Sequence, residues 1–259
     1  MIGITGASGT LGKILIRKLR KFKINFSEFK GDILNENSVN LWIRSQNFES
    51  IFHFAAIVPV DKVEQNKNKT FKVNILGTQN ILNALMHSSQ IPWIFYASTS
   101  HVYDYSKKSI TEKSKINPIN YYGYTKHLGE KVFSYYVKHI NPNVCIGRIF
   151  SFYHRSQKVP FLYPSLKRKI KNKRGNSLEI YGSKNIRDIS KAEDIVDSIY
   201  KIYLKQSVGI INIGSGKGIS VKKFAKNILE DNKINIVDKN KYVPNKLVAD
   251  ITKLKKILK

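Results

Sequence analysis

Short apolar runs alternate with longer stretches in which apolar residues recur every three or four positions, and this alternation governs the first 150 residues of the chain. The short runs predict buried strands at 2–5, 23–28, 50–58, 93–97 and 143–149. The longer stretches predict helices at 14–22, 36–46, 63–88 and 122–137. Strands that alternate with helices favour right-handed crossovers, which place the strands parallel in one sheet with helices on both faces. We therefore expect an α/β fold built on a doubly wound parallel sheet.

The pattern loosens after residue 150 and predicts a second, smaller region. We expect helices at 160–173, 191–204, 220–230 and 251–258, strands near 178–180, 209–213 and 234–237, and an extended run at 185–189. No flexible linker, repeat or low-complexity segment divides the chain. We assign 1–150 to the sheet domain, with 191–213 returning to it, and 151–190 and 214–259 to an interleaved C-terminal region.

A glycine-rich loop joins the first predicted strand to the first predicted helix. The sequence Thr5-Gly6-Ala7-Ser8-Gly9-Thr10-Leu11-Gly12 spaces its glycines as Gly-x-x-Gly-x-x-Gly. Gly6 permits a tight turn, Gly9 lets the backbone approach a pyrophosphate, and Gly12 lets the helix pack closely. Because the start of the helix would offer free N–H groups and a positive dipole, the loop predicts a dinucleotide site. A glycine-rich turn without a ligand is the alternative.

Two further segments are candidates for the wall of that site. Asp32, followed by the apolar Ile33, suits a contact to an adenine amino group, or a simple cap for the helix at 36–46. Ala55 and Ala56 close the third predicted strand with small side chains, which would let a cofactor lie against the backbone. The acidic position that would bind the adenosine ribose is unclear, and no arginine stands where a 2′-phosphate would want one. The sequence therefore does not separate NAD from NADP.

Tyr122 and Lys126 stand four residues apart at the start of a predicted helix, so both side chains can point into one cleft. A tyrosine has a pKa of about 10, and a nearby ammonium would lower it. The pair is therefore a candidate for proton transfer, although the same spacing also fits a surface lysine beside a half-buried ring. Upstream, the fourth strand ends in Ser98-Thr99-Ser100-His101. Hydroxyl groups at the carboxyl end of a parallel strand lie where ligands bind in open α/β sheets.

Taken in order, these motifs resemble those of the extended short-chain dehydrogenase/reductases that act on nucleotide sugars. The resemblance spans nearly the whole chain, and the order and distances of its motifs make it specific. The motifs are Thr5-Gly-x-x-Gly-x-x-Gly12, Gly31-Asp32, His53-Phe54-Ala55-Ala56, Asn74-x-x-Gly77-Thr78, Ser98-Thr99-x-x-Val102-Tyr103, Tyr122-x-x-x-Lys126, Arg187-Asp188 and Asn212-Ile213-Gly214-Ser215-Gly216. The resemblance implies a Rossmann-type dinucleotide-binding domain at 1–150 and a smaller substrate-binding region after it.

The resemblance also implies a role for each candidate residue. Tyr122 would be the general acid/base, Lys126 would hold the nicotinamide ribose, and Thr99 would hydrogen-bond the substrate oxygen. Arg187 would hold the substrate diphosphate, as a bidentate guanidinium can. The cofactor, NAD or NADP, would be lined by Gly6, Ser8, Gly9, Thr10, Leu11, Asp32, Ile33, Ala55, Ala56, Asn74, Tyr122 and Lys126. Ser100, His101 and Ser151 would join Arg187 at the substrate, and no metal is expected.

Two departures from the family's pattern bear on the reaction. Family 4,6-dehydratases carry Asp-Glu after the threonine, as the acid and base for eliminating water, where this chain has Ser100 and His101. Ser151 replaces the family's usual asparagine. The expected function is therefore NAD(P)-dependent reduction of a nucleotide-activated 4-keto-6-deoxy sugar for surface polysaccharides. A nucleotide-sugar epimerase that retains NAD is the alternative, and a homodimer through the helices at 63–88 and 121–138 is implied.

Composition changes this picture little. The net charge is +27, from 45 Lys+Arg against 18 Asp+Glu, which can indicate a nucleic-acid or anionic-membrane partner. The charge is spread along the chain without a nucleic-acid-binding motif, so we attribute it to drift toward lysine, isoleucine and asparagine. A non-catalytic dinucleotide sensor or nucleic-acid-binding member of the fold is the further alternative, against which Thr99, Tyr122 and Lys126 argue. No run approaches the ~20 apolar residues of a membrane span, no signal peptide is evident, and Cys145 is the single cysteine, so we expect a cytoplasmic location.

Overall fold

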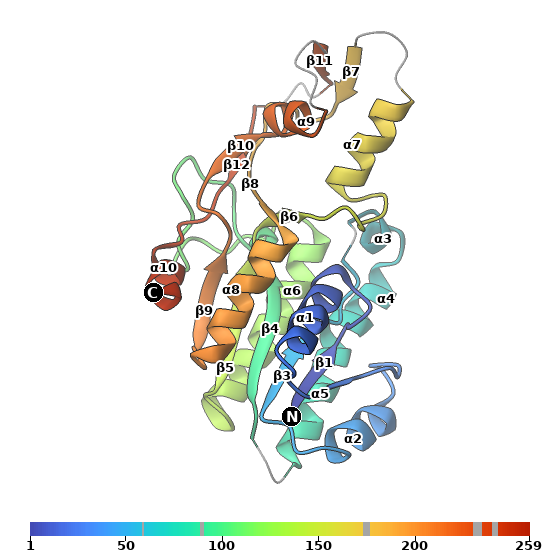
Figure 1. Cartoon of the computed structure of the whole chain (residues 1–259), viewed down its shortest axis with the longest axis vertical. Helices are drawn as coiled ribbons and strands as arrows, with labels where there is room; N and C mark the ends of the chain where they lie inside the picture. Colours follow the sequence, from blue (N-terminus) through green and yellow to red (C-terminus); the bar gives the residue numbers. More distant parts are fainter. Residues whose placement is uncertain (59, 89–90, 173–176, 230–234, 240–242) are drawn as a thin grey trace.

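A six-stranded parallel sheet forms the lower part of the molecule in Figure 1. The computed structural model describes residues 1–58, 60–88, 91–172, 177–229, 235–239 and 243–259. The strands of the main sheet are β1 (Ile2–Thr5), β2 (Phe26–Glu28), β3 (Ser50–His53), β4 (Trp93–Thr99), β5 (Val144–Ile149) and β9 (Gly209–Ile213). They lie in the order β2-β1-β3-β4-β5-β9, and every neighbouring pair is parallel. The predicted doubly wound α/β fold is confirmed.

The strand order changes direction at β1, which has β2 on one side and β3 on the other. In open α/β sheets, ligands bind outside the carboxyl ends of the strands at such a switch point. The carboxyl end of β1 is Thr5, and the glycine-rich loop follows it directly. The topology therefore places this loop where a ligand is expected.

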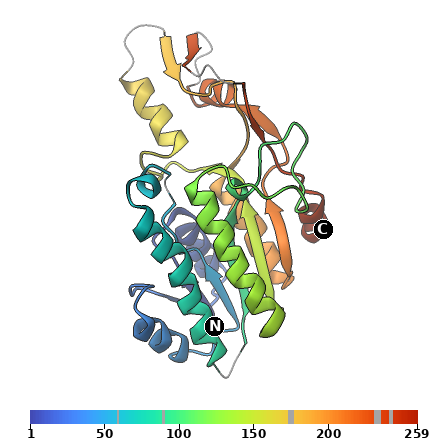
Figure 2. The same ribbon diagram turned by 180° about the vertical axis from the view of Figure 1, so that it is seen from behind.

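Helices cover both faces of the sheet (Figures 1 and 2). On one face, α1 (Thr10–Lys21), α8 (Ala192–Leu204) and α10 (Thr252–Leu258) pack into one apolar cluster with the strands. On the other face, α2 (Glu36–Arg44), α5 (Gly77–Met86) and α6 (Tyr121–His139) pack into a second. The apolar stripes that predicted these helices are their buried faces, as Ile14, Leu15 and Leu19 of α1 illustrate.

The prediction of one continuous helix at 63–88 is wrong. The structure divides this segment into α3 (Val60–Gln65), α4 (Lys67–Phe71), a π-helical turn η1 (Lys72–Leu76) and α5. A new helix starts after Asn66 because its side chain accepts a hydrogen bond from the backbone N–H of Lys69, as an N-cap does. The π-helical turn contains Asn74, whose side chain bonds to the loop that follows β3. Single π-helical turns of this kind are frequent at functional sites.

The upper region is a set of short elements on one side of the main sheet (Figure 1). A small sheet joins β6 (Ser151–Tyr153), β8 (Ile186–Lys191), β10 (Gly218–Ser220) and β12 (Lys246–Leu247), and β7 (Ser177–Ile180) pairs with β11 (Asn235–Asp238). Helices α7 (Leu162–Lys171) and α9 (Val221–Leu229) complete it around a third apolar cluster. The predicted positions 173, 230 and 234 lie outside the described residues. The proposed domain boundaries stay a prediction.

Candidate active site

Helix α6 carries Tyr122 and Lys126 one turn apart, and it packs against β4. Asn120 caps the helix by accepting a hydrogen bond from the backbone N–H of Gly123 at 2.8 Å. Tyr122 is 9% exposed and Lys126 only 2%, so both side chains face the interior. A Cβ at Gly123 would collide with the carbonyl of His101, just beyond β4. Glycine at this position therefore lets the helix start lie directly against the strand end.

Thr99 ends β4 and meets Tyr122 there. Burial raises the pKa of Tyr122 to about 12, and a hydrogen bond from Thr99 partly opposes this rise. The expectation that Lys126 lowers this pKa is wrong. The Lys126 ammonium lies 4.0 Å from the centre of the Tyr96 ring, and its own pKa is lowered to about 7 by burial, against the attraction of Glu130. Tyr122 consequently keeps its proton and is able to act as an acid.

The glycine-rich loop has the shape that a pyrophosphate needs. Gly6 has φ +69°, and a Cβ there would lie 2.6 Å from the backbone nitrogen of Ala55, so only glycine fits. Gly9 is the N-cap of α1, no side chain caps the helix, and its first turn holds no acidic residue. Ser8 and Gly9 are exposed, with Thr10 partly exposed beside them. The helix start thus offers free N–H groups to an anion, which fits a dinucleotide.

The structure excludes one of the two interpretations of Asp32, that of a helix cap, and the adenine contact stays a prediction. Helix α2 is capped by Asn35, which accepts from the backbone N–H of Ser38 at 2.9 Å, so Asp32 is not the cap. Its carboxylate accepts from the backbone N–H of Leu34 at 3.0 Å and remains exposed. Ile33 is buried against Gly77, where a Cβ would lie 2.6 Å from it. Asp32 is therefore available to a ligand, and Ile33 anchors its loop.

Asn74 is buried and ties the loop after β3 to the helix that carries Tyr122. Its Oδ1 accepts from the backbone N–H of Ile57 at 2.7 Å. Its Nδ2 donates to the carbonyl of Ile57 and to Thr125 Oγ1, both at 3.1 Å. Because both amide hydrogens are used within the protein, the side chain positions the wall that includes Ala55 and Ala56.

A buried ion pair that sequence reasoning missed lies one turn beyond Lys126. Arg148 of β5 binds Glu130 in a bidentate arrangement, with Nε to Oε1 at 2.9 Å and Nη2 to Oε2 at 2.7 Å. Ser98 donates to the same carboxylate, and Arg148 Nη1 donates to the hydroxyl of Tyr103 at 2.9 Å. The pKa of Glu130 lies below its usual range in spite of burial, because His127, Arg148 and Ser98 all stabilise the charged carboxylate. The signal available in the sequence was the four-residue spacing from Tyr122 to Lys126 to Glu130.

The residues expected at the substrate are brought together only in part. Arg187 of β8 is held by Asn245, through Nη2 to Oδ1 at 2.5 Å and Nη1 to the carbonyl at 3.1 Å. Its charge acts on His101, whose pKa is lowered to about 4 first by burial and then by Arg187. Ser100 is only 1% exposed, and Ser151 pairs with β8 at the start of β6. The structure thus groups Thr99, His101 and Tyr122, with Arg187 near His101.

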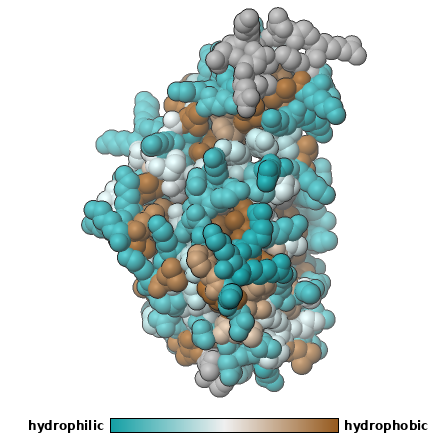
Figure 3. Space-filling view, in the orientation of Figure 1, coloured by the Kyte–Doolittle hydropathy of each residue, from teal (hydrophilic) through white to brown (hydrophobic). Residues whose placement is uncertain are grey.

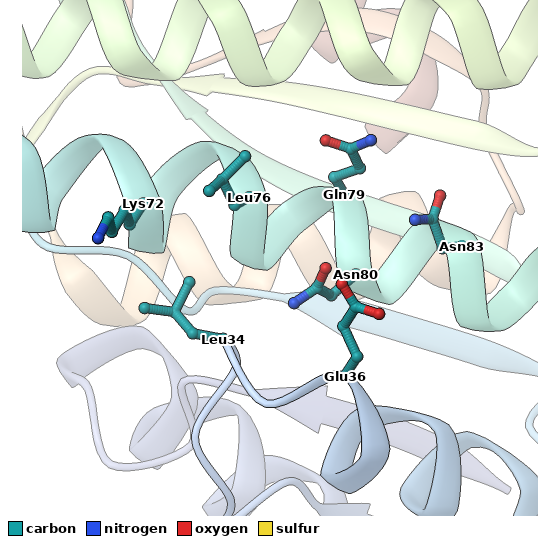
Figure 4. Close-up of a pocket in the computed structure, with 7 residues that line it drawn as sticks. All are labelled: Leu34, Glu36, Lys72, Leu76, Gln79, Asn80 and Asn83. Carbon is teal, nitrogen blue, oxygen red and sulfur yellow. The ribbon is translucent and has the colours of Figure 1, made fainter.

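A separate surface pocket of about 410 Å³ lies between the start of α2 and the η1–α5 segment (Figure 4). It is lined by Leu34, Glu36, Lys72, Leu76, Gln79, Asn80 and Asn83. None of these is a candidate site residue, so this pocket is not the candidate active site. Within the described part of the chain, no group of three or more His, Cys, Asp or Glu residues is placed to hold a metal ion.

The family profile of GDP-mannose 4,6 dehydratase matches residues 4–257, which is nearly the whole chain. The chain belongs to this family. This membership agrees with the resemblance of its motifs to the extended short-chain dehydrogenase/reductases. Family membership fixes the scaffold and the general chemistry, while the reaction on this scaffold depends on individual residues.

Members of this family with several activities resemble the chain. One relative, from Arabidopsis thaliana, is a trifunctional UDP-glucose 4,6-dehydratase/UDP-4-keto-6-deoxy-D-glucose 3,5-epimerase/UDP-4-keto-L-rhamnose-reductase. It is 30% identical to the chain over 92% of the chain's length. The chain spans only 37% of the length of this relative. A UDP-glucose epimerase of Bacillus subtilis, YtcB, described as uncharacterized, is 28% identical over 98% of the chain and 90% of its own length. The structure of RMD from Pseudomonas aeruginosa complexed with NADPH superposes with a TM-score of 0.87, at 21% identity, covering 99% of this chain and 91% of that one.

Breaking the Arg148–Glu130 pair should be costly. Glu130→Gln leaves the Arg148 charge buried without its partner, and we expect the free energy of unfolding to fall by about 3–5 kcal/mol. Asp197→Asn removes an exposed pair with Lys18 and is the matched control, expected to cost less than about 1 kcal/mol. Urea unfolding of both variants measures the difference. Equal losses would show that the buried pair does not stabilise the fold.

The buried Lys126 should make stability depend on pH. Burial lowers the pKa of its ammonium to about 7 in the folded protein from an ordinary 10.5, so between these values the unfolded chain binds more protons. The free energy of unfolding, relative to that of Lys126→Met, should therefore rise with pH from about 7 toward 10.5. Denaturant titrations of both proteins at several pH values test this. A difference that stays constant over that interval would contradict the lowered pKa.

Proposed function

We propose that the protein reduces the keto group of a nucleotide-activated 4-keto-6-deoxy sugar, with NADH or NADPH as the cofactor. The observation that carries the proposal is the composition of the site at the end of β4. A protonated Tyr122 meets Thr99 there, whereas Ser100 and His101 stand where family dehydratases carry their acid and base. The site retains what a reduction needs and lacks the carboxylates of the elimination. A reductase is also one of the activities named for the Arabidopsis relative.

The chain's own residues supply the proton and the orientation. When bound, the nicotinamide cofactor supplies the hydride for the keto carbon. Tyr122 gives its phenolic proton to the oxygen on which negative charge develops, and Thr99 polarises that oxygen through a hydrogen bond. Lys126 follows Tyr122 by one turn on α6, and its ammonium would hold the nicotinamide ribose. Arg187, fixed by Asn245, would bind the substrate diphosphate.

The cofactor would lie along the switch point of the sheet. The uncapped start of α1 would receive the pyrophosphate, and the exposed Asp32 would contact the adenine. NADPH is bound in the Pseudomonas aeruginosa structure, which shares this fold. The adenosine ribose end of the site carries no feature that selects NAD over NADP. We place the reaction in the cytoplasm, where reduced nicotinamide cofactors are available.

An epimerase is the second candidate, because the Bacillus subtilis relative is described as one and the same Tyr122 and Lys126 would serve. An epimerase oxidises and then reduces one carbon, so it retains its cofactor.

A non-catalytic nucleic-acid-binding role is the third candidate, because of the charge of +27. Hydrophilic side chains cover most of the face shown in Figure 3, with apolar ones in small groups. No helix of the described residues is both long enough and apolar enough to span a bilayer.

The first experiment mixes the protein with NADH or NADPH and a panel of nucleotide 4-keto-6-deoxy sugars and follows nicotinamide absorbance. We expect loss of reduced cofactor in a one-to-one ratio with product, and a loss of rate of about a hundredfold or more in Tyr122→Phe. Tyr181→Phe, at a tyrosine that is 71% exposed and far along the chain, is the control and should keep full activity. An altered sugar without net loss of cofactor would support the epimerase instead.

We also propose that the protein is a homodimer. Helices α5 and α6 lie side by side on the face shown in Figure 2. Apolar and aromatic side chains are exposed on the α4–α6 segments, namely Phe71, Leu76, Met86, Tyr124 and Tyr135, and Leu76 also forms part of the pocket in Figure 4. Light scattering should give a mass twice the 29.7 kDa of the chain, and Tyr135→Lys should lower it. A monomeric mass at micromolar concentration would rule the dimer out.

A further inference from the structure

We propose that His101 is a fixed hydrogen-bond donor to the substrate, locked in its Nε2–H tautomer by the residue that caps α6. The inference rests on the proposed function, since it concerns the same cleft, and it assigns to His101 one chemical role and excludes another. His101 would bind a substrate oxygen and could not take a proton from the substrate. It would thus decide which of the family's reactions this chain performs.

The orientation of the Asn120 amide is fixed by the helix that it caps. Its oxygen lies 2.8 Å from the backbone nitrogen of Gly123. A backbone N–H only donates, so the atom facing it has to be the amide oxygen. The other end of the same amide, Nδ2, lies 2.9 Å from Nδ1 of His101. The usual ambiguity between the two ends of an asparagine amide is therefore removed here.

The position of the hydrogen on the His101 ring follows from this orientation. An amide NH2 group is a donor only, so Nδ1 of His101 accepts and carries no hydrogen. A neutral imidazole has one N–H, which must then be on Nε2. Burial and the charge of Arg187 lower the His101 pKa to about 4, so the ring is neutral near pH 7.

The backbone of His101 is held as firmly as its ring. Its backbone N–H donates to Thr99 Oγ1 at 3.3 Å, and its carbonyl accepts from the backbone N–H of Ile119 at 3.1 Å. The ring meets that of Tyr122 edge to face, with 5.8 Å between the centres and 77° between the planes. Among the described residues, we find no hydrogen-bond partner for Nε2, and the side chain is half-buried. Nε2 is therefore the atom of His101 left for a ligand beside Thr99 and Tyr122.

This geometry leaves the His101 ring with one hydrogen-bond donor, Nε2–H, and with no free nitrogen that could act as a base. The lone pair that could accept a proton, on Nδ1, is occupied by Asn120. At this position the resemblance to the family places the glutamate of the 4,6-dehydratases, whose reaction removes a proton from a carbon. A ring with a single outward N–H can orient a carbonyl or hydroxyl oxygen of the sugar, but cannot perform that step. The chain is thereby confined to chemistry at the carbon that Tyr122 and Thr99 serve.

The tautomer can be tested without any substrate. Two-bond 15N–1H correlation spectra separate the tautomers of the six histidines, and His101→Gln assigns the signal of His101. We expect the Nε2–H form in the wild-type protein, neutral from pH 6 to 8. Asn120→Asp is the matched variant, because aspartate caps a helix as well as asparagine but presents an acceptor to Nδ1. It should move the hydrogen to Nδ1 or raise the pKa of the ring.

A wild-type Nδ1–H signal, or an unchanged ring in Asn120→Asp, would overturn the proposed lock. Since no cofactor or sugar is needed, these outcomes stand whether or not the protein is a reductase.

A second experiment uses the substrate that the absorbance assay identifies. His101→Leu removes the donor and should raise KM about tenfold to a hundredfold with a smaller effect on kcat, whereas His101→Gln keeps an N–H and should lose less. Equal KM values in the wild type and His101→Leu would exclude the donor role.

Discussion

The buried pair of Arg148 and Glu130 is the interaction on which the geometry of the site depends. It joins β5 to α6, and through Ser98 it also joins β4, whose next residue is Thr99. A hydrogen bond from Arg148 to Tyr103, and from there to Asn212 of β9, extends the network to the edge of the sheet. Two charges in a dry interior are stable only when every partner is in place, so the pair tolerates few arrangements of these elements. The register of α6 against the sheet, and with it the meeting of Tyr122 with Thr99, is set by this requirement.

Close packing of α6 against β4 also fixes the position of this helix. A Cβ at Gly129 would collide with the hydroxyl of Tyr96, and one at Gly123 would collide with the carbonyl of His101. The helix therefore lies nearer to β4 than side chains would permit. That approach buries Tyr122 and Lys126, which raises the pKa of the phenol and lowers that of the ammonium. A phenol that keeps its proton is suited to protonating an alkoxide, so the packing of the helix and the direction of the proposed chemistry are linked.

The sequence predicted the elements that repeat a pattern and missed those that depend on a single contact. The strands were predicted from short apolar runs, since strands such as β1, β3 and β5 are buried at every position, and helices such as α1 from apolar residues that recur along one buried face. The break in the helix at 63–88 was not, since it depends on two asparagine side chains, Asn66 and Asn74, that bond to backbone. Strands β6, β10 and β12 are too short to show alternation. The same division holds at the site. The spacing predicted that Lys126 follows Tyr122 on one helix face, but it did not show how deeply Tyr122 is buried. Burial raises the pKa of Tyr122, where the sequence predicted a lowered one.

Under the proposed function, the choice between reactions in this cleft depends on Asn120, which makes two hydrogen bonds. Asn120 stabilises the start of α6 through its oxygen and fixes the His101 ring through its nitrogen. Helix capping alone accepts several side chains, among them serine, threonine and aspartate. Aspartate could cap the helix but has no hydrogen to donate to Nδ1, whereas the Asn120 amide does both through its two ends. A substitution of the dehydratase glutamate by histidine would leave the ring free to act as a base unless its inner nitrogen were occupied. The pairing of Asn120 with His101 meets that condition, so the proposed lock would exclude elimination on a scaffold shared with dehydratases while leaving Tyr122, Thr99 and Lys126 available for the proposed reduction.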